Sequence, residues 1–479
     1  MELEHVLKEK FGYDSFREGQ KEVIESILNG QDTFALLPTG KGKSLCYQLP
    51  GYMMNGTVLI ISPLLSLMQD QVEQLKKLGE KRVAALNSFL SKEEKRFVWQ
   101  HISEFRFLFL SPEMLSSTIV REKIHELNLS LIVVDEAHCI SQWGFDFRPE
   151  YLQIADAMPE NRPPILALSA TATKAMTEDI STYLKMNDMQ TFRYSVDRAN
   201  LHYEVVEVES FEKQQKIMEQ IEQFEGPGIV YTQSRKKAEK YAEQLASKNI
   251  RCAFYHAGME QEDRRFIQHQ FLSGQLDWIC ATNAFGMGVH KENIRQIIHD
   301  YIPQNVASYM QEVGRAGRDG QAALCTIYVE ATDWTRTLEV AMLDLPQQWQ
   351  IDEFLRYTQS GMRPDLLVTE GKMSETTYRV LAYWMNHLLP EDVLMKVQQL
   401  AMTKKQQLSE LVHILSGSCI REGLLRYFDE EKNVDIANCC SSCGLNRHEI
   451  LKKHIKRNRS KESVEWRERI QRLLPMHSN

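Results

Sequence analysis

The chain has 479 residues, which at about 150 residues per domain predicts three domains. Its 57 Lys and Arg residues against 65 Asp and Glu residues leave a formal net charge of −8, which excludes a basic coat over the whole surface. Any nucleic-acid contact must therefore come from local clusters or aromatic groups. A hydrophobic content of 43% and a charged content of 25% are typical of a globular protein and exclude large-scale disorder.

The first residues and the cysteines indicate a cytoplasmic protein without a membrane partner. No stretch reaches the roughly 20 apolar residues of a spanning helix, and residues 1–14 are charged and amphipathic, unlike a secretory signal. Five of the nine cysteines are scattered, and the other four cluster near the end of the chain at Cys419, Cys439, Cys440 and Cys443. In a reducing compartment such a cluster indicates a metal site rather than disulfide bonds.

Short β-branched and aliphatic runs alternate with amphipathic, charged stretches up to about residue 330. We expect strands at 33–37, 58–61, 107–110, 131–134, 165–168, 228–231, 278–281 and 297–299. Buried runs separated by helices predict parallel sheets with helices on both faces. These strands are too many for one sheet, so a break near residues 197–204 is expected to divide them into two α/β domains.

The character of the chain changes after about residue 335. Residues 338–415 are polar and helix-like, and the cysteine cluster follows. From residue 444 onward, ten basic and four acidic residues give a net charge of +6, which indicates either a loose phosphate contact or a solvated helix face. The domains expected are 1–197, 198–335, a helical insertion at 336–410, a cysteine-bearing subdomain at 411–445 and a basic tail at 446–479.

Residues 38–44 (PTGKGKS) lie between a predicted strand and a predicted helix and match a phosphate-binding loop. Backbone N–H groups of such a loop curl around phosphates. Lys43 would reach the β- and γ-phosphates, and Ser44 would bind Mg²⁺. A chance Gly/Lys turn is the competing interpretation, because Leu37 stands where the general pattern has glycine. The loop residues expected to hold the nucleotide are Thr39, Gly40, Lys41, Gly42, Lys43 and Ser44.

Two further elements contain the residue types that phosphate chemistry needs. Asp135 and Glu136 end a predicted strand, where ligands bind in open α/β sheets. Asp135 would hold Mg²⁺, and Glu136 would orient and deprotonate water. Gln311, Arg315 and Arg318 stand among glycines, and guanidinium groups suit charge building on a γ-phosphate. The competing interpretations are an acidic turn that caps a helix and arginines solvated at a helix end.

With these three elements in place, the sequence resembles superfamily-two helicases and, more narrowly, the RecQ family. The resemblance covers about residues 5–335 and 405–445. It implies an α/β fold of two tandem RecA-like parallel-sheet domains followed by a helical zinc-binding subdomain, with ATP held between the two domains. It also implies that Tyr13 stacks on adenine. Arg17 and Gln20 would hydrogen-bond the nucleotide.

DNA contacts are implied by two segments. Residues 62–72 resemble a DNA-contacting stretch of the first motor domain, and residues 137–149 (AHCISQWGFDFRP) resemble the aromatic-rich loop by which RecQ proteins sense single-stranded DNA. Aromatic rings at alternate positions can stack on bases and a neighbouring arginine can pair with a phosphate, although an isolated alternation would favour the edge of a core. The DNA-binding residues expected are Ser62, Gln142, Trp143, Phe145, Phe147 and Arg148.

The cysteine cluster resembles the zinc-binding segment of the family. The expected ligands of a tetrahedral, structural Zn²⁺ site are Cys419, Cys439, Cys440 and Cys443. Many family members have a cysteine where this chain has Ala437, so Cys439 is expected to supply the missing ligand, with His448 in reserve and reduced buried cysteines as the alternative. Residues 444–479 are too few for a winged helix, so the chain resembles a truncated member of the short bacterial RecS type.

Two further features depart from the family pattern. His290 stands where the family has Asp or Asn. About 60 residues, 341–396, separate the motor from the cysteines, which makes this segment longer than in better-known members. Its leucine, tryptophan and tyrosine spacing is typical of helical packing, and we assign it no chemistry.

The function expected is an ATP-dependent DNA helicase that uses ATP, Mg²⁺ and a structural Zn²⁺ and moves 3′ to 5′ on single-stranded DNA, in DNA repair and recombination. The resemblance alone implies the polarity. Expected partners are single-stranded DNA, tailed or forked duplex DNA, single-stranded-DNA-binding protein and recombination proteins. The rivals are an ATP-driven translocase or RNA remodeller and a zinc-bearing DNA-binding adaptor with a decayed motor. Intact phosphate-handling residues argue against decay.

Overall fold

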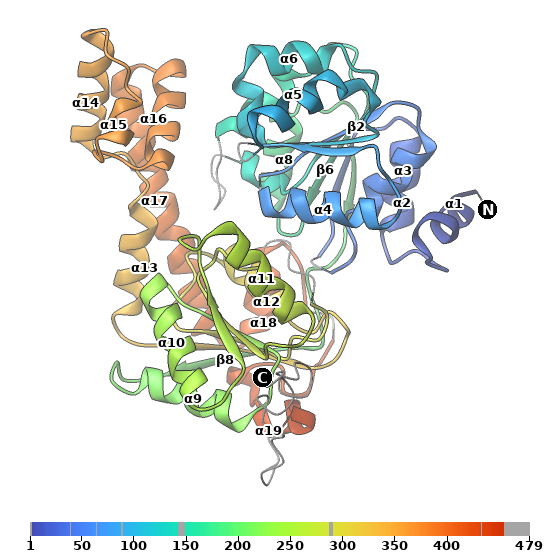
Figure 1. The fold of residues 1–479 in the computed structure, drawn as a ribbon. Coiled ribbons are helices and arrows are strands. Elements are labelled where there is room, and N and C mark those ends of the chain that lie inside the picture. The colour runs from blue at the N-terminus through green and yellow to red at the C-terminus, as the bar shows by residue number, and fades with distance from the viewer. Residues whose placement is uncertain are drawn as a thin grey trace, which may run out of the picture.

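The structure is a computed structural model that describes residues 2–38, 40–63, 65–87, 90–141, 149–286, 291–432 and 434–454. It has two lobes, each built around one parallel sheet, and a helical arm that stands on the second lobe (Figure 1). The first lobe ends near residue 197, and the helical arm comprises residues 343–403. This arrangement confirms the prediction of two α/β domains followed by a helical region.

The sheet of the first lobe has the order β3-β4-β2-β5-β6-β1-β7, and its described strand pairs are all parallel. Its strands are β1 (Thr33–Leu36), β2 (Thr57–Ile61), β3 (Val83–Leu86), β4 (Phe107–Leu110), β5 (Leu129–Val134), β6 (Ile165–Ser169) and β7 (Gln190–Arg193). The inner strands are buried on both faces, which explains their continuous aliphatic runs. The sequence prediction lacks β3 and β7, the two edge strands, because their apolar pattern is weaker.

Helices cover both faces of this sheet, as Figure 1 shows. The helices of this lobe are α1 (Glu2–Val6), η1 (Leu7–Phe11), α2 (Gln20–Leu28), α3 (Leu45–Met53), α4 (Leu65–Lys77), α5 (Lys92–Gln100), η2 (Ile102–Glu104), η3 (Pro112–Ser116), α6 (Thr118–His125), η4 (Ala137–Ile140), η5 (Pro149–Gln153), α7 (Ile154–Ala157) and α8 (Lys174–Tyr183). Side chains fix where several begin. Ser91 and Glu94 form a reciprocal capping box before α5, and the Thr173 hydroxyl accepts a hydrogen bond from the N–H of Met176 in α8.

The second sheet has the order β10-β11-β9-β12-β13-β8, again with parallel pairing between its described strands. Its strands are β8 (Leu201–Glu207), β9 (Gly228–Tyr231), β10 (Cys252–Tyr255), β11 (Trp278–Ala281), β12 (Gln296–His299) and β13 (Ala323–Val329). The helices α9 (Lys213–Gln223), α10 (Arg235–Ser247), α11 (Gln261–Leu272) and α12 (Val306–Val313) connect them. The sequence prediction lacks β8, β10 and β13, although β13 is buried and not at an edge.

The C-terminal region is helical. It contains α13 (Asp333–Met342), α14 (Gln348–Gln359), α15 (Leu366–Thr369), α16 (Glu375–His387), α17 (Pro390–Leu415), α18 (Ile420–Tyr427), η6 (Ser441–Cys443), α19 (Arg447–Ile450) and η7 (Lys452–His454). The predicted boundary at residue 410 falls inside α17, a continuous helix of 26 residues. In the described part of the chain, no helix combines the length and the apolar character needed to cross a membrane.

Helix α17 belongs to two hydrophobic cores. Its first half supplies Val393, Val397 and Leu400 to a separate core shared with α14, α15 and α16. Its second half supplies Leu408, Leu411, Ile414 and Leu415 to the large core that also contains α18. The arm is therefore a small folded unit of its own, and α17 joins it rigidly to the second lobe.

Candidate active site between the two lobes

The loop between β1 and α3 has the backbone shape of a phosphate-binding loop. Gly40 and Gly42 have φ angles of +91° and +73°, which L-residues rarely adopt. A Cβ atom at Gly42 would lie 2.8 Å from the Gln20 amide nitrogen, so a larger residue would displace that contact. The loop leads into α3 at Leu45, where a helix N-terminus favours anions. Thr39, predicted for this loop, lies outside the described residues.

Residues of the N-terminal segment hold this loop in place. The Gln20 amide donates hydrogen bonds to the carbonyl oxygens of Lys41 at 2.8 Å and Gly42 at 3.1 Å. The Arg17 guanidinium donates to the carbonyl of Gly40. In this arrangement the two side chains predicted to contact the nucleotide brace the phosphate loop, while the ring of Tyr13 is 55% exposed and free to stack.

Two acidic residues follow β5, at the carboxyl end of the sheet. The N–H of Asp135 donates to the carbonyl of Ile61 at 2.9 Å, which fixes the carboxylate beside the end of β2. Glu136 has left-handed backbone angles (φ 49°, ψ 47°), a costly conformation for a residue with a side chain. Its carboxylate lies 3.8 Å from Lys43 Nζ and 3.5 Å from His138 Nδ1. The strained backbone aims Glu136 at the loop lysine.

These adjacent carboxyl groups titrate differently. Burial, followed by the charge of Glu136, raises the pKa of Asp135 to about 6. Burial also opposes ionisation of Glu136, but the positive charges of Lys43, His138 and Arg315 outweigh it, so the pKa of Glu136 is lowered. A cation bound beside Asp135 would therefore offset the cost of ionising this buried carboxyl group, whereas Glu136 is held ionised by its neighbours.

The second lobe brings arginines to the same cleft. Arg315 donates to the carbonyl of Gly286, whose absent side chain leaves the guanidinium room. Arg318 lies against the phosphate loop, since a Cβ atom at Gly40 would be 3.2 Å from Arg318 Cγ. Burial, and then the charges of Arg315 and Arg198, lower the pKa of Arg318 to about 10. Because its surroundings disfavour the charged form of Arg318, an anion bound beside it would be stabilising.

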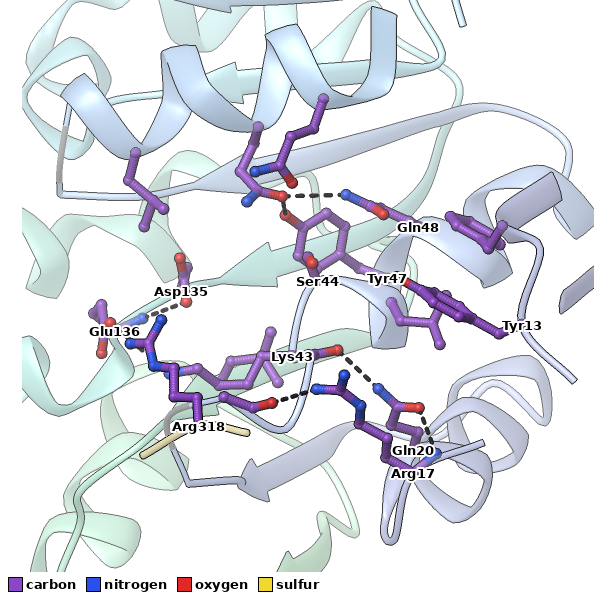
Figure 2. Close-up of a pocket in the computed structure, with 18 of the residues that line it drawn as sticks. Tyr13, Arg17, Gln20, Lys43, Ser44, Tyr47, Gln48, Asp135, Glu136 and Arg318 are labelled. Atoms are coloured by element: carbon purple, nitrogen blue, oxygen red, sulfur yellow. Dashed lines mark hydrogen bonds and ion pairs between the residues drawn. The ribbon is translucent and has the colours of Figure 1, made fainter. Parts of the chain in front are cut away.

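Together these residues line one cleft of about 320 Å³ (Figure 2). In Figure 2, Glu136 and Arg318 lie at one end, Tyr13 lies at the other and Lys43 lies between them. The predicted residues that the cleft brings together are Tyr13, Arg17, Gln20, Gly40, Gly42, Lys43, Ser44, Asp135, Glu136, Gln311, Arg315 and Arg318. Lys41 does not line it and instead pairs with Glu18 at 2.9 Å. The volume falls within the range of small-molecule sites.

Sequence reasoning missed Tyr47 and Gln48, which also line the cleft. Both lie one helical turn after Ser44, so helical spacing from the phosphate loop was the signal that could have found them. The Tyr47 hydroxyl and the Gln48 amide each donate to Gln71 Oε1 at 3.1 Å. They connect the helix after the loop to α4, and Figure 2 shows this junction above Ser44.

One predicted DNA contact, Ser62, is buried in this structure. Ser62 follows β2 directly, beside the buried carboxylate of Asp135. It is 2% exposed, so little of it is accessible to a DNA strand. The pairing of Asp135 with the end of β2 buries it there. The other predicted DNA-binding residues, Gln142, Trp143, Phe145, Phe147 and Arg148, lie outside the described residues, as does His290.

The four clustered cysteines form a second site. Their sulfur atoms all lie within 4.8 Å of one another, with Cys419 and Cys439 at 3.9 Å and Cys440 and Cys443 at 3.5 Å. Tetrahedral Zn²⁺ with bonds of about 2.3 Å requires sulfur separations of about 3.8 Å, so these thiols fit that ion. His448 is engaged elsewhere, since its Nε2 lies 3.1 Å from the Gln223 amide and its ring packs on Phe224.

This cysteine segment covers the free edge of β8. The N–H of Tyr203 donates to the carbonyl of Cys439 at 3.3 Å, and the N–H of Val205 donates to the Ser441 hydroxyl at 3.2 Å. Arg421 is fully buried, pairs with Asp197 and lies 5.1 Å above the Tyr203 ring. An exposed parallel edge strand invites aggregation, and the segment closes it.

Two family descriptions match the chain. The DEAD/DEAH box helicase family matches residues 17–180, and the helicase conserved C-terminal domain matches residues 212–320. Among solved structures, the helicase MrfA bound to DNA has a TM-score of 0.60 at 20% identity and covers 84% of this chain and 57% of its own. The yeast protein Dbp5 bound to RNA and ADP BeF3 has a TM-score of 0.58 at 15% identity, covering 71% and 90%. These likenesses confirm the fold of two RecA-like domains.

Curated relatives are closer in sequence. A probable ATP-dependent DNA helicase RecS of Bacillus subtilis is 43% identical over 459 residues, which is 92% of each chain. The ATP-dependent DNA helicase RecQ of Haemophilus influenzae is 41% identical over 360 residues, which is 73% of this chain but only 56% of that protein. The chain thus spans most of RecS and about half of the RecQ relatives. By this similarity over nearly its whole length, the chain belongs to the RecQ family of superfamily-two helicases.

Proposed function

We propose that this protein is an ATP-dependent DNA helicase that moves along single-stranded DNA and separates duplex DNA. The observation that supports it best is a single cleft in which Lys43 and Glu136 of the first lobe face Arg315 and Arg318 of the second. A nucleotide in that cleft contacts both lobes, so its hydrolysis changes how they are held together. Membership of a family whose named members are ATP-dependent DNA helicases supports the choice of nucleic acid.

The first lobe binds and positions the nucleotide. Lys43 contacts the β- and γ-phosphates, and the N–H groups of the loop surround them. Tyr13 stacks on the base at the far end of the cleft, while Arg17 and Gln20 keep the loop in shape. Ser44 and Asp135 are the residues that would hold Mg²⁺, which neutralises phosphate charge when it is bound.

Glu136 orients the attacking water and accepts its proton. Its lowered pKa keeps it ionised for this role. His138 lies between Glu136 and Ser169, with its Nδ1 3.5 Å from the Glu136 carboxylate and 3.0 Å from the Ser169 hydroxyl. His138 thus links the water site to the 169–171 segment at the end of β6, by an electrostatic contact with Glu136 and a hydrogen bond with Ser169, so hydrolysis and movement of that segment are coupled.

The second lobe completes the site. Arg315 and Arg318 stabilise the charge that builds on the γ-phosphate, with Gln311 beside them. Loss of the γ-phosphate removes the anion that holds both arginines, so the cleft opens and the strand moves. Residues 142–148 bind single-stranded DNA by base stacking. The same proposal includes 3′-to-5′ polarity and action on tailed and forked duplexes. It also includes repair and recombination partners, a cytoplasmic setting and a structural Zn²⁺ on the four cysteines.

A strand-displacement assay tests the proposal. The wild-type protein should unwind a 3′-tailed DNA duplex only with ATP and Mg²⁺, and a 5′-tailed duplex poorly. Lys43→Ala should reduce hydrolysis by at least about 100-fold, because a cationic contact with the phosphates is lost, yet retain single-stranded DNA binding. Lys123→Ala, which removes an exposed lysine paired with Glu126, is the matched control and should act as wild type.

Three results would contradict this function. Undiminished hydrolysis in Lys43→Ala would show that the cleft is not the ATPase site. Absence of unwinding despite DNA-stimulated hydrolysis would leave a translocase. Stimulation of hydrolysis by single-stranded RNA equal to or above that by DNA would favour an RNA remodeller.

A further inference from the structure

The helical arm makes a further connection between the lobes, away from the cleft. It is rooted in the second lobe through the C-terminal half of α17, which packs with α18 in one core. Its other end meets the first lobe, where Arg379 of α16 lies 3.4 Å from Glu113 in η3 and 3.9 Å from Glu150 in η5. Helix α17 is about 39 Å long, so a rigid element spans the distance.

The two contacted segments are tied to each other. The Ser116 hydroxyl and the Arg121 guanidinium donate to Gln153 Oε1 at 3.4 and 3.0 Å, which joins the region of η3 to η5. Arg379 itself is 40% exposed, Glu113 29% and Glu150 12%, so the ion pairs are partly screened. Such pairs are individually weak, which suits a contact that forms and breaks during a cycle.

From η5 a hydrogen bond reaches the backbone that carries the catalytic carboxylates. Tyr151, the residue after Glu150, is fully buried, and its hydroxyl donates to the carbonyl oxygen of Asp135 at 2.9 Å. The Asp135 carbonyl is also the group that precedes the strained Glu136. A displacement of η5 by the arm therefore acts on the backbone that aims both carboxylates.

We propose that the helical arm is a built-in strut that reports the position of the second lobe to the water-activating carboxylates, through Arg379, Glu150 and Tyr151. Arg379 is a positioning residue, not a catalytic one. The inference rests on the proposed ATPase function and assigns a role to the long segment between the motor and the cysteines. When the lobes approach, α17 presses α16 onto η3 and η5, and η5 holds the Asp135–Glu136 backbone in its working geometry.

Charge reversal at Arg379 tests the strut. In Arg379→Glu, hydrogen exchange of the 112–116 and 149–153 segments should rise, and the kcat of DNA-stimulated ATP hydrolysis should fall roughly two- to five-fold with an unchanged KM for ATP. The charge-swapped set Arg379→Glu with Glu113→Arg and Glu150→Arg, which reverses both partners of Arg379 on the first lobe, should restore both. Arg363→Glu is the matched control, because Arg363 is 81% exposed and pairs with Asp365 within the arm.

Tyr151→Phe provides a second variant that removes only a hydroxyl group. It should lower the same kcat roughly five-fold without loss of folding, measured by thermal melting. Unchanged hydrogen exchange in Arg379→Glu, unchanged turnover despite increased exchange, or no restoration by the swap would each overturn the strut. If the wild-type protein hydrolyses no ATP, the proposed function fails, while the exchange measurement still decides whether the arm holds η3 and η5.

Discussion

At the scale of single residues, Asp135 and Glu136 differ although they are neighbours. Burial raises the pKa of Asp135 to about 6, well above its ordinary value of 3.8. The neighbouring Lys43, His138 and Arg315 lower the pKa of Glu136 despite the same burial. Asp135 is thereby suited to bind a cation and Glu136 to accept a proton, so two adjacent residues at the end of one strand have different chemical roles.

The raised pKa of Asp135 has a consequence for stability. The folded protein binds this proton more tightly than an unfolded chain, so the ionised carboxylate lowers stability above about pH 6 and the penalty disappears as the pH falls below 4. Asp135→Asn should therefore raise the free energy of unfolding of the nucleotide-free protein by about 1 to 3 kcal/mol near neutral pH, and less at pH 5. Thermal melting at both pH values measures this difference.

The same variant should lose ATP hydrolysis by at least about 100-fold, since its amide cannot hold the cation as a carboxylate does. Asp156→Asn, which alters an exposed aspartate paired with Lys185, is the control for both measurements. An Asp135→Asn protein that melts below the wild type at neutral pH would contradict the account of its burial.

The sequence predicted most residues of this site because they lie in short motifs with fixed spacing. It placed Ser62 on DNA, whereas the pairing of β2 with β5 buries it beside Asp135. It missed Tyr47 and Gln48 because a buried polar residue in a helix has no motif of its own. Local spacing predicts which groups bind phosphate, but the sheet order decides which other side chains join them.

At the scale of elements, α17 shows what periodicity cannot predict. Its apolar residues recur at helical spacing over the whole length, so the sequence indicates a helix. The same spacing does not say that residues before 400 face the arm and residues after 408 face the second lobe. The predicted boundary at 410 therefore follows composition, while the packing partner changes within the helix.

The cysteine segment is a second case at this scale. Cys439 lies with the other three sulfurs although Ala437 interrupts the usual spacing, and the segment closes the edge of β8. Cys440→Ser should abolish stoichiometric zinc and lower the free energy of unfolding by at least about 2 kcal/mol, because binding energy and folding energy are shared in such a site. Elemental analysis and thermal melting measure the two effects.

Cys252→Ser is the matched control. Cys252 lies outside the cluster and donates to the carbonyl of Ala242, a bond that a serine hydroxyl keeps. A Cys440→Ser protein with full zinc content would show that the cluster holds no ion or holds it without this sulfur.

At the scale of the whole molecule, the two lobes are connected by polar side chains on helix faces that the sequence pattern predicts to face solvent. Gln69 and Asp70 of α4 accept hydrogen bonds from Arg265 at 2.6 Å and Gln268 at 3.1 Å of α11. Burial raises the pKa of Asp70 to about 6, so this contact is partly desolvated. Two lobes around one cleft were predictable, but these contacts arise only from tertiary placement.

Lobe closure places Arg318 against the phosphate loop, and this makes it the most informative residue for the motor as a whole. Its pKa of about 10 keeps it charged at neutral pH, yet burial and the nearby Arg315 oppose that charge until an anion arrives. In Arg318→Ala, nucleotide affinity should change by less than about ten-fold, because the first lobe supplies most contacts, while ATP hydrolysis should fall by about 1,000-fold. The loss is larger in turnover because the γ-phosphate gains charge only in the transition state.

Steady-state hydrolysis and titration with a fluorescent nucleotide separate these two effects. Arg336→Ala, which removes a half-exposed arginine paired with Glu330 in the second lobe, is the control. If Arg318→Ala hydrolyses ATP within ten-fold of the wild type, the two lobes do not share the phosphate during turnover, and the motor does not work by closing this cleft. A parallel loss of binding and turnover would instead make Arg318 a binding residue, since an interaction present in both states lowers affinity without a selective loss of rate.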